Sequence, residues 1–149
     1  MSCDIIKQIY RINCLSAEMD ALYHRASLKI GVADSAMRVL YTIYDNGESC
    51  LLSDIYKQSG ISKQTVHSAI CKLENDGILY LEPYHGKSKK VFLTDQGKVY
   101  IKQTAARIYE AESNTFKTWS NEWTQDEINA YLQMLEKYIE LFRQQVENL

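Results

Sequence analysis

A stretch near the middle of the chain, residues 62–72, carries hydrogen-bonding and basic side chains at spacings that suit contact with a nucleic acid. If this stretch is helical with Val66 and Ile70 facing inward, its other face presents Gln64, Ser68 and Cys71. Glutamine pairs bidentately with adenine, serine and threonine meet base edges or phosphates, and lysine meets phosphate. We therefore expect contacts with duplex DNA from the residues on and around this face: Ser62, Lys63, Gln64, Thr65, His67, Ser68 and Lys72.

The helix that presents these side chains has clear limits in the sequence. Ser62 is a good N-cap, since its hydroxyl accepts from free amides of the first turn. Gly77 is a good terminator, because glycine adopts the left-handed conformation of a Schellman end. Between them, apolar residues recur every three or four positions and predict one buried stripe: Val66, Ala69, Ile70 and Leu73.

Elements on both sides of this helix support the DNA-binding interpretation. A shorter helix over residues 53–58 precedes it, and Ser59-Gly60 supplies the turn between the two. Two runs rich in β-formers follow, Ile78–Glu82 and Lys89–Thr94, which is typical of a hairpin. The tip of this hairpin carries three basic residues and no nearby acid, which predicts phosphate contacts from Lys87, Lys89 and Lys90.

A helix-turn-helix followed by a basic hairpin resembles the MarR family of bacterial transcriptional regulators. The segments that carry the resemblance are Leu52–Ile55, Gly60–Val66, Leu73–Gly77 and Val91–Gly97. The resemblance implies a mainly α fold with a small β-hairpin wing, in which a winged helix-turn-helix core is flanked by long N- and C-terminal dimerisation helices. The family's wing often carries an Asp-x-Arg motif, whereas here the tip is His85–Lys90, and lysine lacks the planar fork of arginine.

The rest of the chain fits that organisation. Residues 1–30 and 98–149 contain neither glycine nor proline and predict long helices, so we expect one domain over residues 1–149 with its winged core at 32–97 and helical dimerisation parts at 1–31 and 98–149. Residues 53–102 hold 8 basic and 5 acidic residues, although the whole chain has a net charge of −2. Positive charge is thus concentrated on the elements expected to meet DNA.

Local signals also predict the remaining helices. A helix over 4–29 ends at Gly31, and Asp34 or Ser35 caps the next. Thr94 caps a long helix that runs towards Trp119, and a capping box at Thr124–Glu127 starts the last one.

The apolar stripes of the terminal helices are wider than a small winged core can cover. We therefore expect a homodimer, in which the first and last helices of two subunits intertwine as the family resemblance implies. The alternative is a monomeric helical bundle beside the winged core.

Cysteine and histidine usage gives no sign of a metal or cofactor site. The four cysteines, Cys3, Cys14, Cys50 and Cys71, lack CxxC spacing, and His24, His67 and His85 have no ligand-like spacing with them. One branch of the family senses peroxide through a cysteine in the first helix, which makes Cys14 a redox candidate by resemblance. Because Cys14 lies in the middle of a helix and not at a helix start, however, we expect it to be a small buried residue.

The expected function is a dimeric, sequence-specific regulator that binds a pseudo-palindromic operator as a repressor and is released by a small aromatic or anionic effector. The 11 tyrosines suit such a ligand, but no effector-binding residue is indicated. Alternatives are a cysteine-based redox regulator of the same fold and a dimeric winged-helix module that binds protein. Catalytic motifs and membrane-length apolar runs are absent from the sequence, so we expect a cytoplasmic protein that is not an enzyme.

Overall fold

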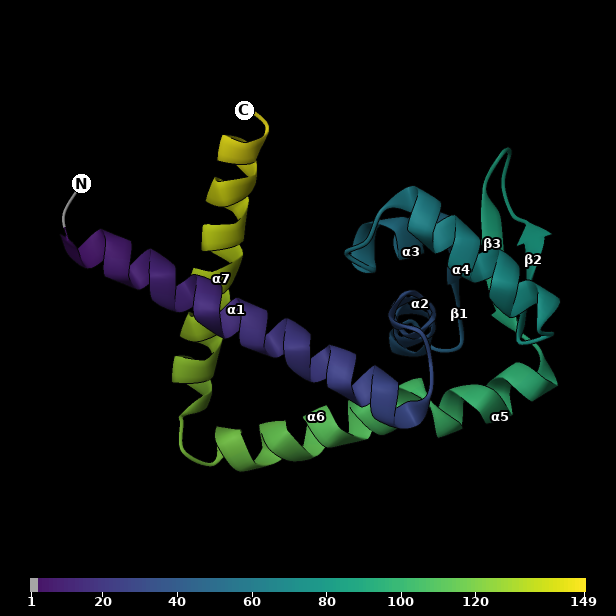
Figure 1. Ribbon diagram of the computed structural model, residues 1–149, viewed down its shortest axis with the longest axis horizontal. Helices are drawn as coiled ribbons and strands as arrows, with labels where there is room; N and C mark the ends of the chain where they lie inside the picture. Colours follow the sequence, from purple (N-terminus) through teal and green to yellow (C-terminus); the bar gives the residue numbers. More distant parts are fainter. Residues whose placement is uncertain (1–2) are drawn as a thin grey trace. The chain divides into compact units, whose positions relative to one another are not determined.

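The computed structural model describes residues 3–149, which divide into two compact units, one up to Tyr109 and the other Glu110–Leu149. The first unit is a winged body with a long N-terminal helix, and the second consists of the rest of α6 and α7 (Figure 1). The expectation of a single domain over residues 1–149 stays a prediction. In chain order the elements are α1 (Cys3–Ile30), α2 (Asp34–Asp45), β1 (Ser49–Leu51), α3 (Leu52–Gln58), α4 (Lys63–Asn75), β2 (Leu79–Pro83), β3 (Lys89–Leu93), α5 (Asp95–Gln103), α6 (Ala105–Ser120) and α7 (Gln125–Val146).

The fold is the predicted one, mainly helical with a small wing. The three strands form one antiparallel sheet in the order β1-β3-β2, so that β3 is central. Tyr80 pairs with Phe92 and Glu82 with Lys90 across the hairpin, while Cys50 of β1 pairs with Val91. Pro83 ends β2 at the sheet edge, where its missing N–H breaks no ladder bond.

Both ends of α4 have the predicted chemistry. Ser62 Oγ accepts a hydrogen bond from the Thr65 N–H at 3.1 Å, which confirms the N-cap. Gly77 has φ of +71°, and the Ile78 N–H donates to the Leu73 carbonyl at 2.9 Å. This is a Schellman end, and it turns the chain directly into β2.

The predicted cap of α2 is wrong. Its N-cap is Ala33, whose side chain accepts no capping hydrogen bond. Asp34 is the first residue of the helix, and its carboxylate lies 2.6 Å from His24 Nδ1. The negative charge still favours this helix end through the helix dipole.

The predicted long helix from Thr94 towards Trp119 is divided in two. Thr94 Oγ1 accepts from the Gly97 N–H at 2.9 Å, as expected of a cap, and donates to the Gly77 carbonyl at 2.6 Å. The break comes at Thr104, with φ −123° and ψ −95°, between α5 and α6. Thr104 is buried and its hydroxyl donates to the Tyr100 carbonyl at 2.7 Å. A hydroxyl that bonds the carbonyl four residues earlier bends a helix slightly, and here the backbone dihedrals of Thr104 complete the break.

The core of the winged body is made by one face of each surrounding element. All four residues of the predicted α4 stripe are buried in it. They pack with residues of α2, α3, the sheet and α5 that are equally inaccessible to solvent: Val39, Leu40, Ile43, Ile55, Leu79, Val91 and Ile101.

In the second unit, α7 begins with the predicted capping box. Thr124 Oγ1 accepts from the Glu127 N–H at 3.3 Å, and the Thr124 N–H donates to the Glu127 carboxylate at 2.8 Å. These hydrogen bonds hold the pKa of Glu127 below its ordinary value. Ile128 alone is buried among the residues of α7, all of which are described.

Candidate nucleic-acid interface

The outer face of α4 is exposed and free of carboxylates over its first three turns. Each of the predicted contact residues there is exposed: Ser62, Lys63, Gln64, Thr65, His67, Ser68 and Lys72. The first turn contains no acidic residue. The N–H groups and positive dipole end of this helix are therefore available to a phosphate.

Hydrogen bonds within α4 assign different capacities to these polar side chains. The hydroxyl of Ser62 caps the helix and lies 2.8 Å from Thr65 Oγ1, and Ser68 Oγ donates to the Gln64 carbonyl at 3.1 Å. Within the described residues, the side-chain amide of Gln64 forms no hydrogen bond. Gln64 thus keeps both donor and acceptor for a base edge, while the three hydroxyls are partly engaged.

The lysine, histidine and cysteine side chains of α4 lie close to other side chains. Lys63 Nζ lies 5.9 Å from the centroid of the Tyr56 ring on α3, a cation–π distance that restrains the lysine near the helix start. Further along, His67 Nε2 lies 3.6 Å from Cys71 Sγ. Lys72 belongs to the last turn, about 13 Å along the helix axis from Lys63. Lys63 and Lys72 can therefore meet phosphates on opposite sides of a groove.

The three wing lysines are not equivalent. The loop between β2 and β3 is closed by hydrogen bonds from the Tyr84 N–H to the Ser88 carbonyl and from the Ser88 N–H to the His85 carbonyl, both 2.9 Å. Lys87 and Lys89 are exposed at this tip.

Lys90, in contrast, is half-buried. Its Nζ lies 5.3 Å from the Phe92 ring centroid and 5.9 Å from that of Tyr84. Lys90 also faces Glu82 across the hairpin. Its charge is therefore less available to DNA than those of Lys87 and Lys89.

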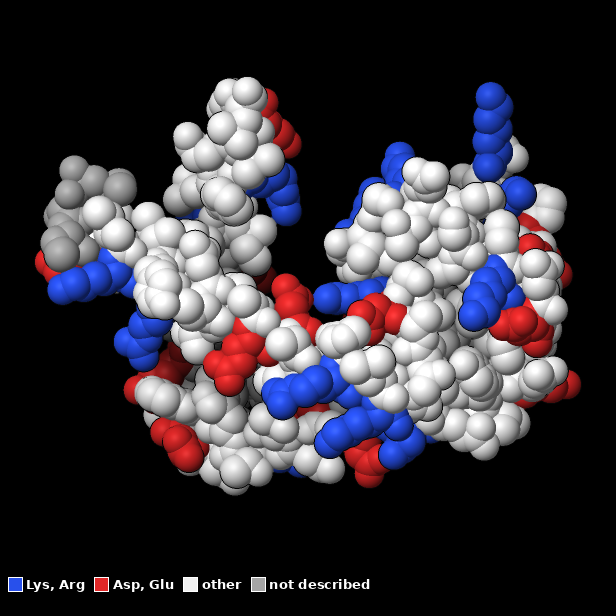
Figure 2. Space-filling model, viewed as in Figure 1, with Lys and Arg blue, Asp and Glu red and all other residues white. Residues whose placement is uncertain are grey.

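Basic side chains mark the edge of the winged body that carries α4 and the wing. Figure 2 shows Lys and Arg side chains at the tip of the hairpin and beside the N-terminal end of α4. The acidic residues of this part of the chain, such as Glu74 and Asp76, follow at the C-terminal end of α4. The predicted positive edge is thus formed by elements that fold next to one another.

A second feature of the winged body is a cavity of about 270 Å³ beneath α2. Its apolar wall consists of Tyr23, Met37, Tyr41 and Ile108. It extends to Gln58 and Ser59, the residues at the turn between α3 and α4. The cavity therefore touches the element that sets the position of α4.

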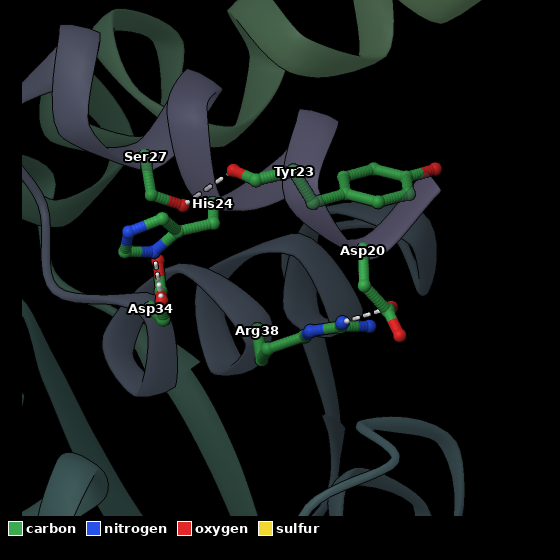
Figure 3. A network of polar contacts seen from close by, with 6 residues as sticks. All are labelled: Asp20, Tyr23, His24, Ser27, Asp34 and Arg38. Atoms are coloured by element: carbon green, nitrogen blue, oxygen red, sulfur yellow. Dashed lines mark hydrogen bonds and ion pairs between the residues drawn. The ribbon is translucent and has the colours of Figure 1, made fainter. Parts of the chain in front are cut away.

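Several of the residues that line this cavity form a network of polar contacts between α1 and α2 (Figure 3). The imidazole of His24 lies against the Asp34 carboxylate, and the Arg38 guanidinium donates to Asp20 Oδ1 at 3.3 Å. The guanidinium carbon of Arg38 is also 5.6 Å from the Tyr23 ring centroid. These contacts join α1 to α2 at a place where both helices are exposed.

Ser59 is one of the cavity residues, none of which the sequence interpretation identified. It is 2% exposed, and its Oγ has no hydrogen-bond partner within residues 3–149. A buried hydroxyl without a partner is rare in folded proteins. In the sequence Ser59 is an ordinary turn residue, and its burial depends on packing against distant helices, so no local signal identified it.

The thiols differ in environment. Cys14 is exposed on α1, so the expectation of a small buried residue is wrong for this subunit by itself. Cys50 is buried, and burial raises the pKa of its thiol to about 11, helped by the charge of Asp54 and opposed by that of Lys90. Cys3 lies outside the residues whose side chains are described.

The described residues offer neither a metal site nor a membrane-spanning helix. Residues 3–149 contain no cluster of three or more His, Cys, Asp and Glu side chains that could hold a metal ion. Among the helices in that range, none has both the length and the apolar character needed to span a bilayer.

Comparisons with known proteins point to one family. Residues 30–87 match the model of the MarR family. No curated protein matches the chain.

Solved structures share the fold over most of the chain. A MarR family regulator from Neisseria meningitidis is similar with a TM-score of 0.76, at 19% identity and over 99% of both chains. A MarR family regulator from Silicibacter pomeroyi gives 0.68, at 20% identity, over 89% of this chain and 87% of its own. BpsR of Bordetella bronchiseptica, whose DNA binding is regulated by 6-hydroxynicotinic acid, gives 0.58 at 19% identity, over 87% and 91%.

Proposed function

We propose that this chain, whose residues 30–87 match the model of the MarR family, acts as a dimeric, sequence-specific DNA-binding transcriptional regulator. It binds a pseudo-palindromic operator as a repressor, and a small molecule releases it. The chain has the fold of MarR family regulators, which are non-enzymatic proteins.

The observation that carries this proposal is the outer face of α4. It combines a glutamine amide that has no hydrogen-bond partner among the described residues with exposed hydroxyls and two lysines, on a helix whose inner face is fixed by the core. Residues near the N-terminus of a recognition helix are those that reach base edges in a major groove. Gln64 is therefore the base-reading residue, and Lys63, Lys72, Lys87 and Lys89 contact phosphates.

Exposed apolar side chains support the dimer. On α7 such residues recur along the whole helix, and on α1 they extend from Ile5 to Leu22. Exposed apolar side chains that recur along a helix in this way mark an interaction surface. A second copy of the chain presents the same surface, and a closed two-fold dimer buries both copies at once.

The proposal is tested by selecting bound sequences from a random duplex pool and titrating the selected duplex at several salt concentrations. We expect an inverted repeat whose half-site centres are about 10 base pairs apart, since a two-fold dimer places two α4 helices in successive major grooves. Inserting about half a helical turn between the half-sites should abolish tight binding. Equal affinity for selected and scrambled duplexes would reject sequence-specific regulation and leave the protein-interaction module.

Gln64→Ala tests the assigned base contact within the same experiment. We expect it to weaken binding to the selected site by about 1–3 kcal/mol and to relax the preference at one base position in each half-site. The matched control is Gln103→Ala, which removes an exposed glutamine on α5. A Gln64→Ala protein with unchanged base preference would show that another residue reads the sequence.

A redox-sensing regulator of the same fold is the second candidate, and the exposed thiol of Cys14 is the observation that favours it. Treating the DNA complex with peroxide, with Cys14→Ser as the control, separates the two. Release of DNA that depends on Cys14 supports redox sensing, whereas release by a small molecule in both proteins supports the first proposal.

A further inference from the structure

We propose that Tyr56 of α3 is a positioning residue for DNA binding, because its ring holds the ammonium group of Lys63 where that group meets a backbone phosphate and not a base. This role rests on the proposed function, since it belongs to the same interface. Tyr56 is absent from the residues that the sequence pattern assigned to DNA contact. It acts through Lys63 and does not touch a base itself.

The ring of Tyr56 is held by the core of the winged body. Tyr56 is partly buried and packs against that core, as does Ile61 on the other side of the turn between α3 and α4. Its neighbour in the chain, Ile55, is fully inaccessible to solvent and fixes α3 from within. Because a tyrosine ring has only two side-chain torsions, packing of this kind leaves it little freedom. The ring therefore offers a fixed surface beside the start of α4.

Lys63 is the first residue of α4, and its ammonium group lies near this ring. The Nζ atom is 5.9 Å from the ring centroid, within the range of about 6 Å over which a cation is attracted to an aromatic face. Within the described residues, no carboxylate forms an ion pair with Lys63. The ring of Tyr56 thus restrains this cation, and a restrained lysine loses less side-chain freedom when it meets a phosphate.

The side of α4 on which the contact lies favours a phosphate over a base. In a helix-turn-helix the second helix enters the major groove, whereas the first helix crosses the DNA backbone. α3 is that first helix, and it lies beside the start of α4 (Figure 1). A lysine held at the α3 side of α4 is therefore placed at the backbone, which leaves the base edges to Gln64.

Lys72 provides a comparison within the same helix. It is exposed in the last turn of α4, and no aromatic ring of the described residues lies at cation–π distance from it. Both lysines are expected to contact phosphate, but only Lys63 is restrained by a ring. A change at Tyr56 should therefore act on DNA binding through Lys63 and not through Lys72.

A double-mutant cycle tests this role. Tyr56→Leu, Lys63→Ala and the double variant are titrated with the selected and a scrambled duplex at several salt concentrations, and the melting temperature of each is measured. We expect Tyr56→Leu to weaken binding of both duplexes about 3- to 10-fold when Lys63 is present and less than about 2-fold when it is absent. An equal loss in both backgrounds would overturn the proposal, because it would mean that Tyr56 supports only the fold of α3.

The salt dependence and the base preference give two further readouts. Lys63→Ala should lower the magnitude of the salt slope by about one per subunit, whereas Tyr56→Leu keeps the charge and should leave the slope nearly unchanged. Lys63→Ala should also weaken selected and scrambled duplexes alike. A changed base preference in Lys63→Ala would show that Lys63 reads a base, which contradicts the position assigned to it.

Two matched variants serve as controls. Tyr56→Phe keeps the ring and should bind both duplexes nearly as tightly as the wild-type chain does. Combining Tyr56→Leu with Lys72→Ala should multiply the two separate losses, as expected of independent sites. A Tyr56→Phe protein as weak as Tyr56→Leu would show that the hydroxyl contacts DNA directly. That result, or coupling to Lys72 as strong as that to Lys63, would overturn the positioning role.

The contact can also be measured in the wild-type chain, which covers the case that Tyr56→Leu does not fold. The ring current of Tyr56 should shift the NMR signals of the Lys63 ε protons upfield of those of Lys57, an exposed lysine on α3. Tyr56→Phe should preserve this shift. Lys63 signals at the position of those of Lys57 would overturn the proposal.

The scrambled duplex separates this role from the function on which it rests, because a phosphate contact does not depend on base sequence. A wild-type chain that preferred no sequence would reject the proposed function, while the coupling between Tyr56 and Lys63 would still be measured with either duplex. A chain with a clear sequence preference but no such coupling would retain the proposed function and lose the role assigned to Tyr56.

Discussion

The winged body and α7 differ in how far their apolar side chains are exposed to solvent. In the winged body, α2, α4 and the sheet bury their apolar faces against one another, and Leu40, Ile55 and Val66 are fully inaccessible to solvent. On α7, Leu135 is 42% exposed and Phe142 is 59% exposed, although the helix has as regular an apolar pattern as α4. The winged body buries its own apolar residues and can therefore be stable within one chain. A helix such as α7, whose apolar face stays exposed, requires a partner surface to cover it.

This difference separates two contributions to function. The core of the winged body fixes the orientation of α4, and therefore which side chains can meet a base. The exposed face of α7, in our proposal, fixes how far apart two such bodies lie. The orientation of α4 depends on packing within the chain, whereas the spacing of two winged bodies depends on dimer formation and therefore on protein concentration. Mutations in the two regions should therefore have different signatures.

The largest effect is expected from charges on the apolar face of α7. Replacing both Leu135 and Phe142 with glutamate should raise the dimer dissociation constant by at least about 1,000-fold, because each fully buried side chain contributes about 1.5–3 kcal/mol and both copies change. Analytical ultracentrifugation measures the constant. Specific DNA binding should be lost with the dimer, while isolated winged bodies keep their fold.

The control for this change is Lys137→Ala on the same helix. Lys137 Nζ bonds the Glu140 carboxylate at 2.8 Å in an exposed pair, and such pairs contribute little. The proposed role of α7 as a dimer surface would be contradicted if the glutamate double variant stayed a dimer, or if the wild-type chain sedimented as a monomer at micromolar concentration.

Thiol reactivity should show the same contrast between buried and exposed positions. Cysteine reacts as the thiolate, and the pKa of Cys50 is raised from 9.0 to about 11, so near pH 8 its thiolate is about 100-fold scarcer than that of an unshifted thiol. Iodoacetamide should therefore modify the exposed Cys14 well before Cys50, as followed by mass spectrometry of digested protein. The same reaction in urea should remove the difference, and equal rates in the native protein would mean that the core around Cys50 opens readily.

Gly97 tests how tightly the winged body is packed. A Cβ at this position would lie 1.8 Å from the Ile78 carbonyl oxygen, a backbone atom that the hydrogen bonds of Thr94 hold in place. Gly97→Ala should therefore lower the melting temperature and cost about 1–3 kcal/mol despite the better helix propensity of alanine. Lys98→Ala, one residue later and exposed, is the control. An unchanged melting temperature would show that α5 can shift away from β2 at little cost.

Much of the winged body could be predicted from local chemistry. The cap at Ser62, the Schellman end at Gly77 and the hairpin after it are decided by residues within a few positions of one another, and the structure has all three. The break at Thr104 was not predicted, because threonine occurs in many uninterrupted helices. Its burial and its bond to Tyr100 depend on how α5 packs.

The two candidate sites also differ in how far the sequence predicts them, because one depends on local periodicity and the other on contacts between distant segments. Helical periodicity alone assigned the outer face of α4, since the inward residues determine the outward ones. The cavity required knowledge of which residues of α1, α2 and α3 meet, and their spacing in the sequence carries no such information. Asp45 at the end of α2 and Ser59 just after α3, for example, lie 14 positions apart.

The smallest effects are expected on the surface of the wing, where the structure divides three lysines that the sequence treated alike. Lys87 and Lys89 are exposed at the tip, whereas Lys90 packs against the Phe92 and Tyr84 rings and faces Glu82. Lys87→Ala or Lys89→Ala should weaken all duplexes similarly, by about 1 kcal/mol or less, and should lower the magnitude of the salt slope by about one per contact in each subunit. Lys90→Ala should leave that slope nearly unchanged and instead lower stability slightly, because it removes a cation from two aromatic faces. Titrations of the selected and a scrambled duplex at several salt concentrations, with the dimer constant measured in parallel, give both quantities. A salt slope that fell as much for Lys90→Ala as for Lys87→Ala would show that the wing turns its sheet face, and not its tip, towards the phosphates.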